Sequence, residues 1–286
     1  MKGVIIAAGY GSRFLPITKT LPKEMLPLYD KTLLDCILDE FEQASITDVV
    51  IITSRRKKVL EDYLDREVEL EGVFKEENKQ KQRESIRPRN LNIAFIRQQE
   101  MKGTGNALLL LKPWINNEPF IVAYPDDIVL HPQGISHQLI QAYKQKPANY
   151  LVVREENENI SRYGVIDSTE EAGKLRVNRI VEKPKPEEAP SHWVSIGRYL
   201  FQPEILDLLE EGWKHHREGE FYHIDAINTL ARQGKVYALP MEGTMLDTGE
   251  PDSYLYSLLL YCQKHPKASL VLKKFFENDY QEGVKA

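Results

Sequence analysis

The stretch KGVIIAAGYGSRFLPITKTLPKEMLP, residues 2–27, decides the fold because it joins a buried strand to a loop suited to anions. Residues 4–8 form an uninterrupted apolar run of strand length, which is typical of a parallel strand covered on both faces. Gly9 and Gly11 follow; lacking a Cβ, they can take positive φ and let backbone N–H groups approach an anion. We therefore predict a phosphate-handling loop at the carboxyl end of the first strand, where open α/β sheets bind ligands.

The rest of this loop is basic and stiff. Arg13 and Lys23 add two cations, and three prolines between residues 16 and 27 exclude a regular helix. A dinucleotide fingerprint would need a third glycine where Phe14 stands, and a P-loop would need a Gly-Lys-Ser/Thr triplet that the spacing does not provide. What remains is a semi-rigid basic segment suited to a polyphosphate.

Composition bounds the class of protein. With 286 residues, of which 42% are hydrophobic, the chain can bury a substantial α/β core. A net charge of −5 argues against nucleic acid or anionic lipid as a partner, so local basic loops must bind any phosphate. Cys36 and Cys262 lack metal-binding spacing and are expected to be reduced thiols. Without a signal-peptide pattern or a membrane-length apolar run, we expect a soluble cytoplasmic protein.

Apolar strands alternate with helices after the loop, which predicts a doubly wound, mostly parallel, Rossmann-like sheet. Strands are expected at residues 48–53, 91–96 and 120–124, and helices at residues 33–41, 57–64 and 107–111. Thr104 is the expected cap of the last helix. Residues 66–90 are highly charged with sparse apolar anchors, which indicates an exposed helical excursion.

The second half of the chain changes character. Several strands with few long helices between them predict a mixed or antiparallel extension of the sheet. They are expected at residues 150–153, 164–166, 175–182 and 193–201, with helices at residues 205–209, 224–231 and 254–261. Residues 184–190 (PKPEEAP) are too rich in proline for a helix and predict a stiff surface loop. The tail from residue 269 has an amphipathic pattern. No clean linker divides the chain, so we predict a single domain over residues 1–286.

Six segments, in order, resemble the nucleotidyltransferase signature of the NDP-sugar pyrophosphorylases. They are AAGYGSRFLPITKTLPKEMLP (7–27), RQQEMKGTGNA (97–107), PDDIV (125–129), YGVID (163–167), VEKPKPEEAPS (181–191) and LDTGEPDSYL (246–255). The resemblance covers nearly the whole chain. It implies Mg²⁺-dependent transfer of a uridylyl group from UTP to glucose 1-phosphate, giving UDP-glucose and pyrophosphate. It also implies a nucleotide-binding part (about residues 1–150), a sugar-phosphate-binding part (about 151–265) and a tail (266–286).

Such a transfer is a displacement at the α-phosphorus, so it needs positioning and charge neutralisation rather than a covalent nucleophile. Arg13 suits the β and γ phosphates because its fork offers paired donors, and Lys23 suits the α-phosphate or the leaving pyrophosphate. The resemblance makes Asp126 and Asp247 the Mg²⁺ ligands, with Asp127 outside the coordination shell. It thereby assigns catalysis to Arg13, Lys23 and Asp126.

The resemblance also implies how the nucleotide base is held. Gln98 and Gly103 match positions that contact the pyrimidine, while Ala8 and Gly9 would approach it through the main chain and Gly11 would complete the nucleotide loop. Taken alone, a glutamine is more often a surface residue.

A sugar-phosphate clamp is predicted at the end of a strand. The Glu182 carboxylate suits sugar hydroxyl donors and the Lys183 ammonium suits the sugar's phosphate. Gly164 and Gly197 match positions where bare backbone approaches glucose. The plainer interpretation of the Glu182–Lys183 pair is a surface ion pair, which contributes little.

Some positions depart from the uridylyl pattern and leave alternatives open. Asp-Thr-Gly-Glu at residues 247–250 is as close to thymidylyltransferases, His-Ile-Asp at residues 223–225 replaces a usual Leu-Thr-Asp, and Asn106 stands where histidine is frequent. The alternatives are a thymidylyl- or cytidylyltransferase, a noncatalytic nucleotide-sugar sensor and, more weakly, a dehydrogenase. By analogy, a homo-oligomer (dimer or tetramer) is expected, with contacts from the charged excursion or the tail.

Overall fold

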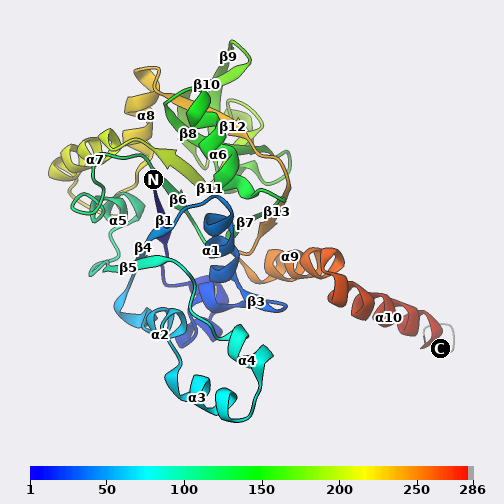
Figure 1. The fold of residues 1–286 in the computed structure, drawn as a ribbon. Coiled ribbons are helices and arrows are strands. Elements are labelled where there is room, and N and C mark those ends of the chain that lie inside the picture. The colour runs from blue at the N-terminus through cyan, green and yellow to red at the C-terminus, as the bar shows by residue number, and fades with distance from the viewer. Residues whose placement is uncertain (283–286) are drawn as a thin grey trace.

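The computed structural model describes residues 1–282, and its centre is a nine-stranded mixed sheet (Figure 1). The strand order is β5-β4-β1-β6-β11-β8-β12-β10-β9. The strands are β1 (Lys2–Ile6), β4 (Asp48–Thr53), β5 (Asn92–Arg97), β6 (Phe120–Ala123), β8 (Asn149–Glu155), β9 (Gly164–Glu171), β10 (Lys174–Glu182), β11 (Trp193–Phe201) and β12 (Val236–Pro240). Two small antiparallel sheets pair β2 (Pro27–Leu28) with β3 (Lys31–Thr32), and β7 (Asp127–Leu130) with β13 (Thr244–Asp247).

The sheet has a parallel half and a mixed half, as predicted. Strands β5, β4, β1 and β6 are parallel, which brings their carboxyl ends to one edge. Strand β11 then runs antiparallel to both β6 and β8, β12 is parallel to β8, and β10 is antiparallel to β12 and β9. The doubly wound, mostly parallel sheet with a mixed extension is therefore confirmed.

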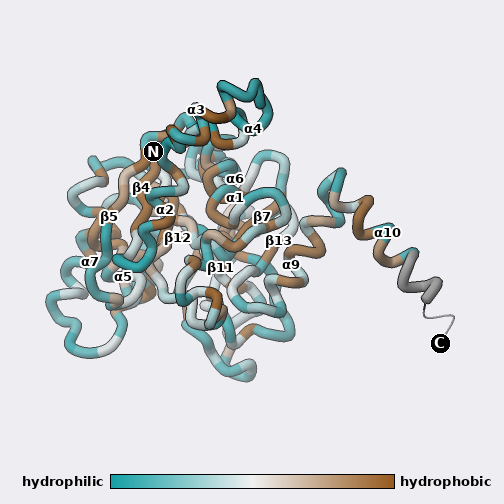
Figure 2. The backbone as a smooth tube through the Cα atoms, turned by 90° about the horizontal axis from the view of Figure 1, so that it is seen from below, coloured by the Kyte–Doolittle hydropathy of each residue, from teal (hydrophilic) through white to brown (hydrophobic). Residues whose placement is uncertain are grey.

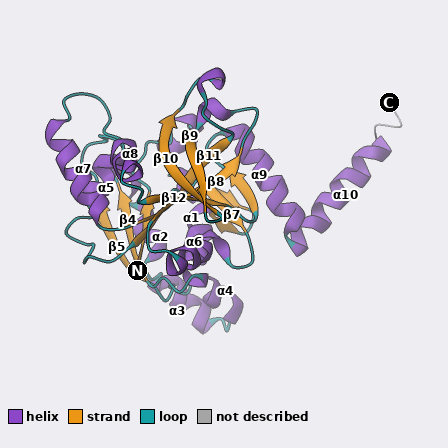
Figure 3. Ribbon diagram, turned by 90° about the horizontal axis from the view of Figure 1, so that it is seen from above, coloured by secondary structure: helices purple, strands orange, loops and turns teal. Residues whose placement is uncertain are grey.

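Helices cover both faces of the sheet (Figure 3) because the core strands are apolar on both sides. In β1, Val4 and Ile6 pack into one core while Ile5 packs into the other. The ten helices of the described residues are α1 (Leu33–Gln43), α2 (Val59–Leu64), α3 (Val68–Glu76), α4 (Gln80–Ser85), α5 (Thr104–Leu109), α6 (Gly134–Gln145), α7 (Glu204–His215), α8 (Ile224–Arg232), α9 (Pro251–Lys264) and α10 (Pro266–Glu282). Helices α5, α7 and α8 share the first core, and α1 and α6 share the second.

The loop after β1 contains no regular helix, as its prolines predicted. It turns through three short 3₁₀ segments, Ser12–Phe14, Ile17–Lys19 and Lys23–Met25. Positive φ occurs at Gly11 (φ 66°), whose carbonyl accepts a hydrogen bond from Thr18 Oγ1 at 2.7 Å, but not at Gly9. The loop is thus stiffened by turns and by its own hydrogen bond.

Several local expectations need correction. Helix α5 begins at Thr104, and the Thr104 hydroxyl does not cap it but lies 2.8 Å from His223 Nδ1. The loop at residues 184–190 includes one 3₁₀ turn, Pro186–Glu188. Helix α6 and strands β2, β3, β7, β12 and β13 had no counterpart in the expected elements. The exposed excursion is as expected, because neither α3 nor α4 has a buried residue.

The C-terminal helices extend from the body of the molecule (Figure 1). Helix α10 packs against α9 and carries exposed apolar side chains at Leu270, Val271, Phe275 and Phe276. Figure 2 shows hydrophobic stretches, in brown, along α10. No helix in residues 1–282 has the length and apolar character needed to cross a bilayer.

Candidate active site

Gly249 marks the point where the first loop and the two aspartate-bearing segments meet. A Cβ placed on Gly249 would lie 3.1 Å from Asp247 Oδ1, 3.3 Å from Arg13 Nη1 and 3.6 Å from Asp126 Oδ2. Side chains separated by more than a hundred residues therefore surround one small volume. Gly249 keeps that volume open, because a Cβ there would crowd Asp247 and Arg13 and touch Asp126.

Lys23 joins the same cluster. Its Nζ donates to Asp126 Oδ2 at 2.7 Å, and both side chains are largely withdrawn from solvent. Burial disfavours both charges, yet mutual attraction outweighs it: the pKa of Lys23 is raised and the pKa of Asp126 is lowered. The pair therefore stays fully ionised at neutral pH, and Lys23 presents a permanent cation beside Arg13 and Asp126.

A second ion pair, between Lys57 and Glu24, is buried next to Lys23 in the sequence and in space. Lys57 Nζ donates to both Glu24 carboxylate oxygens, at 2.7 and 2.8 Å. Burial lowers the pKa of Lys57 even though Glu24 opposes that shift. Because Glu24 follows Lys23 directly, this pair ties the loop to the segment after β4. Sequence reasoning missed it, since Lys57 stands in a run of basic residues that looks solvent-exposed.

The two candidate Mg²⁺ ligands come from segments that a small sheet holds together. Strand β7 pairs with β13 so that Asp127 lies opposite Asp247, and Asp126 precedes β7. Asp127 Oδ2 accepts a hydrogen bond from the Gly197 backbone N–H at 2.8 Å. Burial, followed by the charges of Asp126 and Asp247, raises the pKa of Asp127 to about 7. The Asp127 carboxylate is thus bound to a backbone N–H, which is compatible with the prediction that Asp127 is not a Mg²⁺ ligand.

The carboxylates of Asp126 and Asp247 fit Mg²⁺. Within residues 1–282, no group of three or more His, Cys, Asp or Glu side chains has metal-binding geometry. Two carboxylates are nevertheless a usual protein contribution to Mg²⁺, because phosphate oxygens and water complete its shell. Asp247 Oδ1 accepts from the Gly249 N–H at 2.9 Å, which orients the carboxylate within the cluster.

The predicted base-reading residues lie at the edge formed by the ends of the parallel strands. Gln98 follows β5 and is buried, and its Nε2 donates to Gly103 O at 3.1 Å and to Asn106 Oδ1 at 2.9 Å. Gly103 has φ 91°, and a Cβ there would lie 2.6 Å from the Phe221 carbonyl oxygen, so the position requires glycine. Ala8 is buried, whereas Gly9 faces open space.

A cavity of about 220 Å³ lies beside the aspartate cluster and takes in most of the predicted sugar site. Asp126, Gly164, Glu182 and Gly197 line it. A Cβ on Gly197 would lie 2.4 Å from Asp127 Oδ2, and one on Gly164 would lie 2.7 Å from Ile180 Cδ1, so bare backbone forms part of the wall.

Lys183 is placed differently from the other predicted sugar-site residues. Its side chain is 63% exposed and its Nζ is 3.8 Å from Glu182 Oε1. It does not line the cavity, whereas Arg162 does. Sequence reasoning missed Arg162, although it directly precedes the Tyr-Gly-Val-Ile-Asp segment.

His223 forms part of the cavity wall, and no role was predicted for it. Its ring stands edge-on to Tyr199, and burial lowers its pKa to about 4. Its Nδ1 is 2.8 Å from the Thr104 hydroxyl, while its buried Nε2 has no hydrogen-bond partner in the described part of the chain. The imidazole is therefore neutral at physiological pH.

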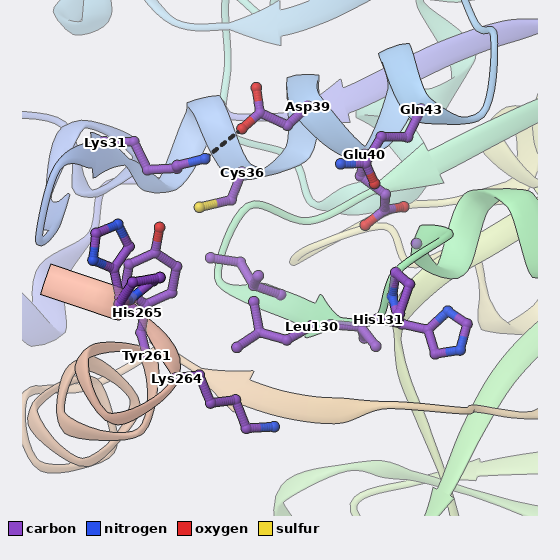
Figure 4. A pocket seen from close by; sticks show the side chains of 15 residues that line it. Lys31, Cys36, Asp39, Glu40, Gln43, Leu130, His131, Tyr261, Lys264 and His265 are labelled. Carbon is purple, nitrogen blue, oxygen red and sulfur yellow. Dashed lines mark hydrogen bonds and ion pairs between the residues drawn. The ribbon is translucent and has the colours of Figure 1, made fainter. Parts of the chain in front are cut away.

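A second cavity, of about 480 Å³, lies between α1, β7 and α9 (Figure 4). Lys31, Asp39, Tyr261 and His265 are among the residues that line it, and Lys31 Nζ is 2.7 Å from Asp39 Oδ2. Its described lining residues include none of the predicted site residues. This cavity is larger than the one beside the aspartates, but the convergence of cations and carboxylates favours the cluster around Gly249.

A basic loop after the first strand of a doubly wound sheet faces two carboxylates across a small gap, an arrangement that is chemically suited to a phosphate-bearing ligand. The chain belongs to the nucleotidyl transferase family, whose model matches residues 2–264.

Named relatives and solved structures are similar to this chain over nearly its full length. The chain is 39% identical to UTP–glucose-1-phosphate uridylyltransferase of Staphylococcus epidermidis, covering 96% of this chain and 97% of the relative. It resembles a UDP-glucose pyrophosphorylase complexed with UDP-glucose (TM-score 0.80, 35% identity, covering 92% and 99% of the two chains). It also resembles a UTP-bound enzyme from Acinetobacter baumannii (TM-score 0.87, 29% identity, covering 96% and 98%).

Proposed function

We propose that this chain transfers a uridylyl group from UTP to glucose 1-phosphate, with Mg²⁺, giving UDP-glucose and pyrophosphate. The names of its relatives support the substrates. The observation that carries the chemistry is the convergence of Arg13, Asp126 and Asp247 on Gly249, with Lys23 bound to Asp126. On this proposal, about residues 1–150 take the nucleotide and about residues 151–265 take the sugar phosphate.

The residues divide the work between positioning and neutralisation. Arg13 and Lys23 bind the triphosphate, and the raised pKa of Lys23 keeps its charge in place throughout the reaction. Asp126 and Asp247 would hold Mg²⁺, which supplies further neutralisation of the phosphates when bound. Glu182 accepts from the sugar hydroxyls and aligns the sugar phosphate. An oxygen of the sugar 1-phosphate then attacks the α-phosphorus of UTP, the bond between the α-phosphorus and the oxygen that bridges it to the β-phosphorus breaks, and pyrophosphate leaves.

The base is proposed to be read beside Gln98. Because the Gly103 carbonyl can only accept a hydrogen bond, the group facing it must be the Gln98 amide nitrogen, which leaves Oε1 for the ligand. An acceptor there suits the N3–H of uracil or thymine, whereas cytosine presents an acceptor at N3. Base selection against CTP therefore follows from the amide orientation.

A pyrophosphate-release assay tests this proposal. UTP, dTTP and CTP are each paired with the 1-phosphates of glucose, galactose and N-acetylglucosamine. We expect the highest kcat/KM with UTP and glucose 1-phosphate. Preference for dTTP would establish the thymidylyl alternative, and binding of UTP without pyrophosphate release from any pair would establish a noncatalytic sensor.

We also propose that the chain forms homo-oligomers through α9 and α10. The groove between these helices has a volume of about 630 Å³ and is lined by Tyr256, Leu259, Leu272 and Phe276 among others. Large exposed apolar surface on a projecting helix is typical of an interface. Light scattering should give a dimer or larger for the intact protein and a monomer for the Phe275→Ser/Phe276→Ser variant. A wild-type monomer would contradict the proposal.

A further inference from the structure

A buried arginine lies next to the aspartate segment of the active site. Arg198 belongs to β11, its side chain is 0% exposed, and its Nη2 donates to Glu40 Oε2 at 2.9 Å. The same Nη2 donates to the main-chain carbonyl oxygen of Asp127 at 3.1 Å. Moving a charged group from water into a protein interior is costly. Because this guanidinium has no solvent exposure, it acts through the groups it contacts and not on a ligand directly.

Strand β11 holds the segment between β6 and β7 at three points. The Gly197 carbonyl accepts from the Tyr124 N–H at 2.9 Å, and the Gly197 N–H donates to Asp127 Oδ2 at 2.8 Å. The third point is the hydrogen bond from Arg198 to the Asp127 carbonyl. Asp126 lies between the two residues that are held. The direction of its carboxylate therefore depends on main chain that β11 fixes on both sides.

Glu40 fastens the guanidinium to two helices. It lies in α1 with a side chain that is 6% exposed, and its Oε1 accepts hydrogen bonds from the N–H, at 3.1 Å, and the hydroxyl of Ser136 in α6. Its other oxygen, Oε2, binds Arg198. A continuous chain of hydrogen bonds thus runs from α1 and α6 through the carboxylate and the guanidinium to the first residue of β7.

Stability alone does not account for this pair. Apolar side chains of similar volume commonly stabilise a core as well as a buried ion pair does. The cost is higher here because Arg198 Nε and Nη1 are buried without a hydrogen-bond partner in the described part of the chain. An apolar pair could fill the same space, but it could not donate a hydrogen bond to the Asp127 carbonyl. That bond is the contribution specific to the arginine.

We propose that Arg198, held by Glu40, is a positioning residue that fixes the main chain at Asp127 and thereby aims the Asp126 carboxylate at the divalent ion and Lys23. This inference rests on the proposed function and adds to it two residues that touch neither substrate. Partners that hold a metal-binding carboxylate from outside the coordination shell typically change metal affinity or activity about tenfold to a hundredfold when they are replaced.

The test compares ion binding with stability in Arg198→Met and in the double variant Glu40→Gln/Arg198→Met. Binding of Mn²⁺, used in place of Mg²⁺, to the protein with saturating UTP and no sugar phosphate is followed by water-proton relaxation, and urea unfolding gives the stability. Arg198→Met should raise the Kd of Mn²⁺ about tenfold to a hundredfold and lower the urea midpoint, because it leaves a buried carboxylate unpaired. The double variant removes both charges but keeps an acceptor for Ser136. Its urea midpoint should return toward wild type, whereas its Kd for Mn²⁺ should stay raised.

Arg89→Met is the matched control on the same helix. Arg89 binds Asp35 and Asp39 of α1, at 2.8 and 2.7 Å, and makes no hydrogen bond or ion pair with the aspartate segment in the described residues. Its loss removes ion pairs from α1 without touching β7. The Kd of Mn²⁺ in this variant should stay within about twofold of wild type.

Two results would overturn the inference. One is a Kd of Mn²⁺ within about twofold of wild type in the double variant, because a pair that serves only the fold would lose its effect once stability is restored. The other is an equal rise of that Kd in Arg89→Met, which would show that any change on α1 disturbs the ion. If Arg198→Met does not fold, the double variant decides alone. Wild-type turnover and wild-type Mn²⁺ binding are measured first, and absence of either would contradict the proposed function itself, and this inference with it.

Discussion

The triphosphate side and the sugar side of this site differ in how well their charged side chains are buried and paired in the absence of a ligand. Lys23 and Asp126 are each 17% exposed and joined at 2.7 Å, and behind them stands the Lys57–Glu24 pair at 5% and 0% exposure. On the sugar side, Glu182 and Lys183 are 42% and 63% exposed and 3.8 Å apart. Preorganised charges lower the barrier for the chemical step, whereas exposed charges are ordered on binding. We therefore expect changes on the first side to affect kcat and changes on the second to affect KM.

The largest effect is expected from Lys23→Ala. It removes a permanent cation from the developing charge on the leaving pyrophosphate, so kcat should fall about a thousandfold or more. Pyrophosphate release at saturating substrates measures this, and thermal unfolding checks that the fold survives. Lys19→Met, an exposed lysine in the same loop, is the control and should stay close to wild type. A kcat for Lys23→Ala within about tenfold of wild type would contradict the expectation that the triphosphate side controls kcat.

Breaking the buried pair should come next. Lys57→Met leaves the Glu24 carboxylate buried without a partner, which should destabilise the protein by about 3–5 kcal/mol. Urea unfolding measures the loss. The double variant Glu24→Gln/Lys57→Met removes both charges and should regain most of it. Equal stability of the single variant and wild type would show that this pair does not hold the loop.

A pH-dependent effect is expected at His223. The unfolded chain protonates this histidine near pH 6.5 and the folded protein near pH 4, so the unfolded state binds more protons between these values. Wild type should therefore lose up to about 3 kcal/mol relative to His223→Leu as the pH falls from 7 to 4. Chemical unfolding of both proteins at several pH values measures this difference. A difference that is constant with pH would show that the buried imidazole is not the source.

The smallest effect is expected on the sugar side. Glu182→Gln keeps the shape and an acceptor oxygen but removes the charge, so the KM for glucose 1-phosphate should rise by about tenfold while kcat changes little. Initial rates over a range of sugar phosphate give both constants. A fall in kcat as large as that of Lys23→Ala would mean that the sugar side is as preorganised as the triphosphate side.

Sequence patterns within a few neighbouring residues predicted the elements whose structure depends on those residues alone. An apolar run followed by glycines and prolines specifies a buried strand and a loop that cannot be a helix, and both are present. The meeting of Asp126 with Asp247 came from family resemblance, because no spacing relates two aspartates so far apart. Strands β7 and β13, which bring them together, are four residues each and carry too little periodicity to be recognised.

Other features depend on contacts that no local pattern contains. The Glu24–Lys57 pair joins two segments that read as solvent-exposed, and Arg162 acquires its position only when Tyr163 and Asp247 meet. Thr104 fits the cap pattern, but the backbone conformation of Gly103 and the nearby His223 give its hydroxyl another partner. The exposed position of Lys183 follows from its backbone conformation, which sequence does not reveal.

The most direct measurement is a crystal structure with a non-hydrolysable UTP analogue and Mn²⁺ in place of Mg²⁺, the ion being located by its anomalous scattering. We expect the ion between the carboxylates of Asp126 and Asp247, with the phosphates in contact with Arg13 and Lys23. An ion or triphosphate bound elsewhere, for instance in the cavity between α1 and α9, would contradict the assignment of these four residues to one site.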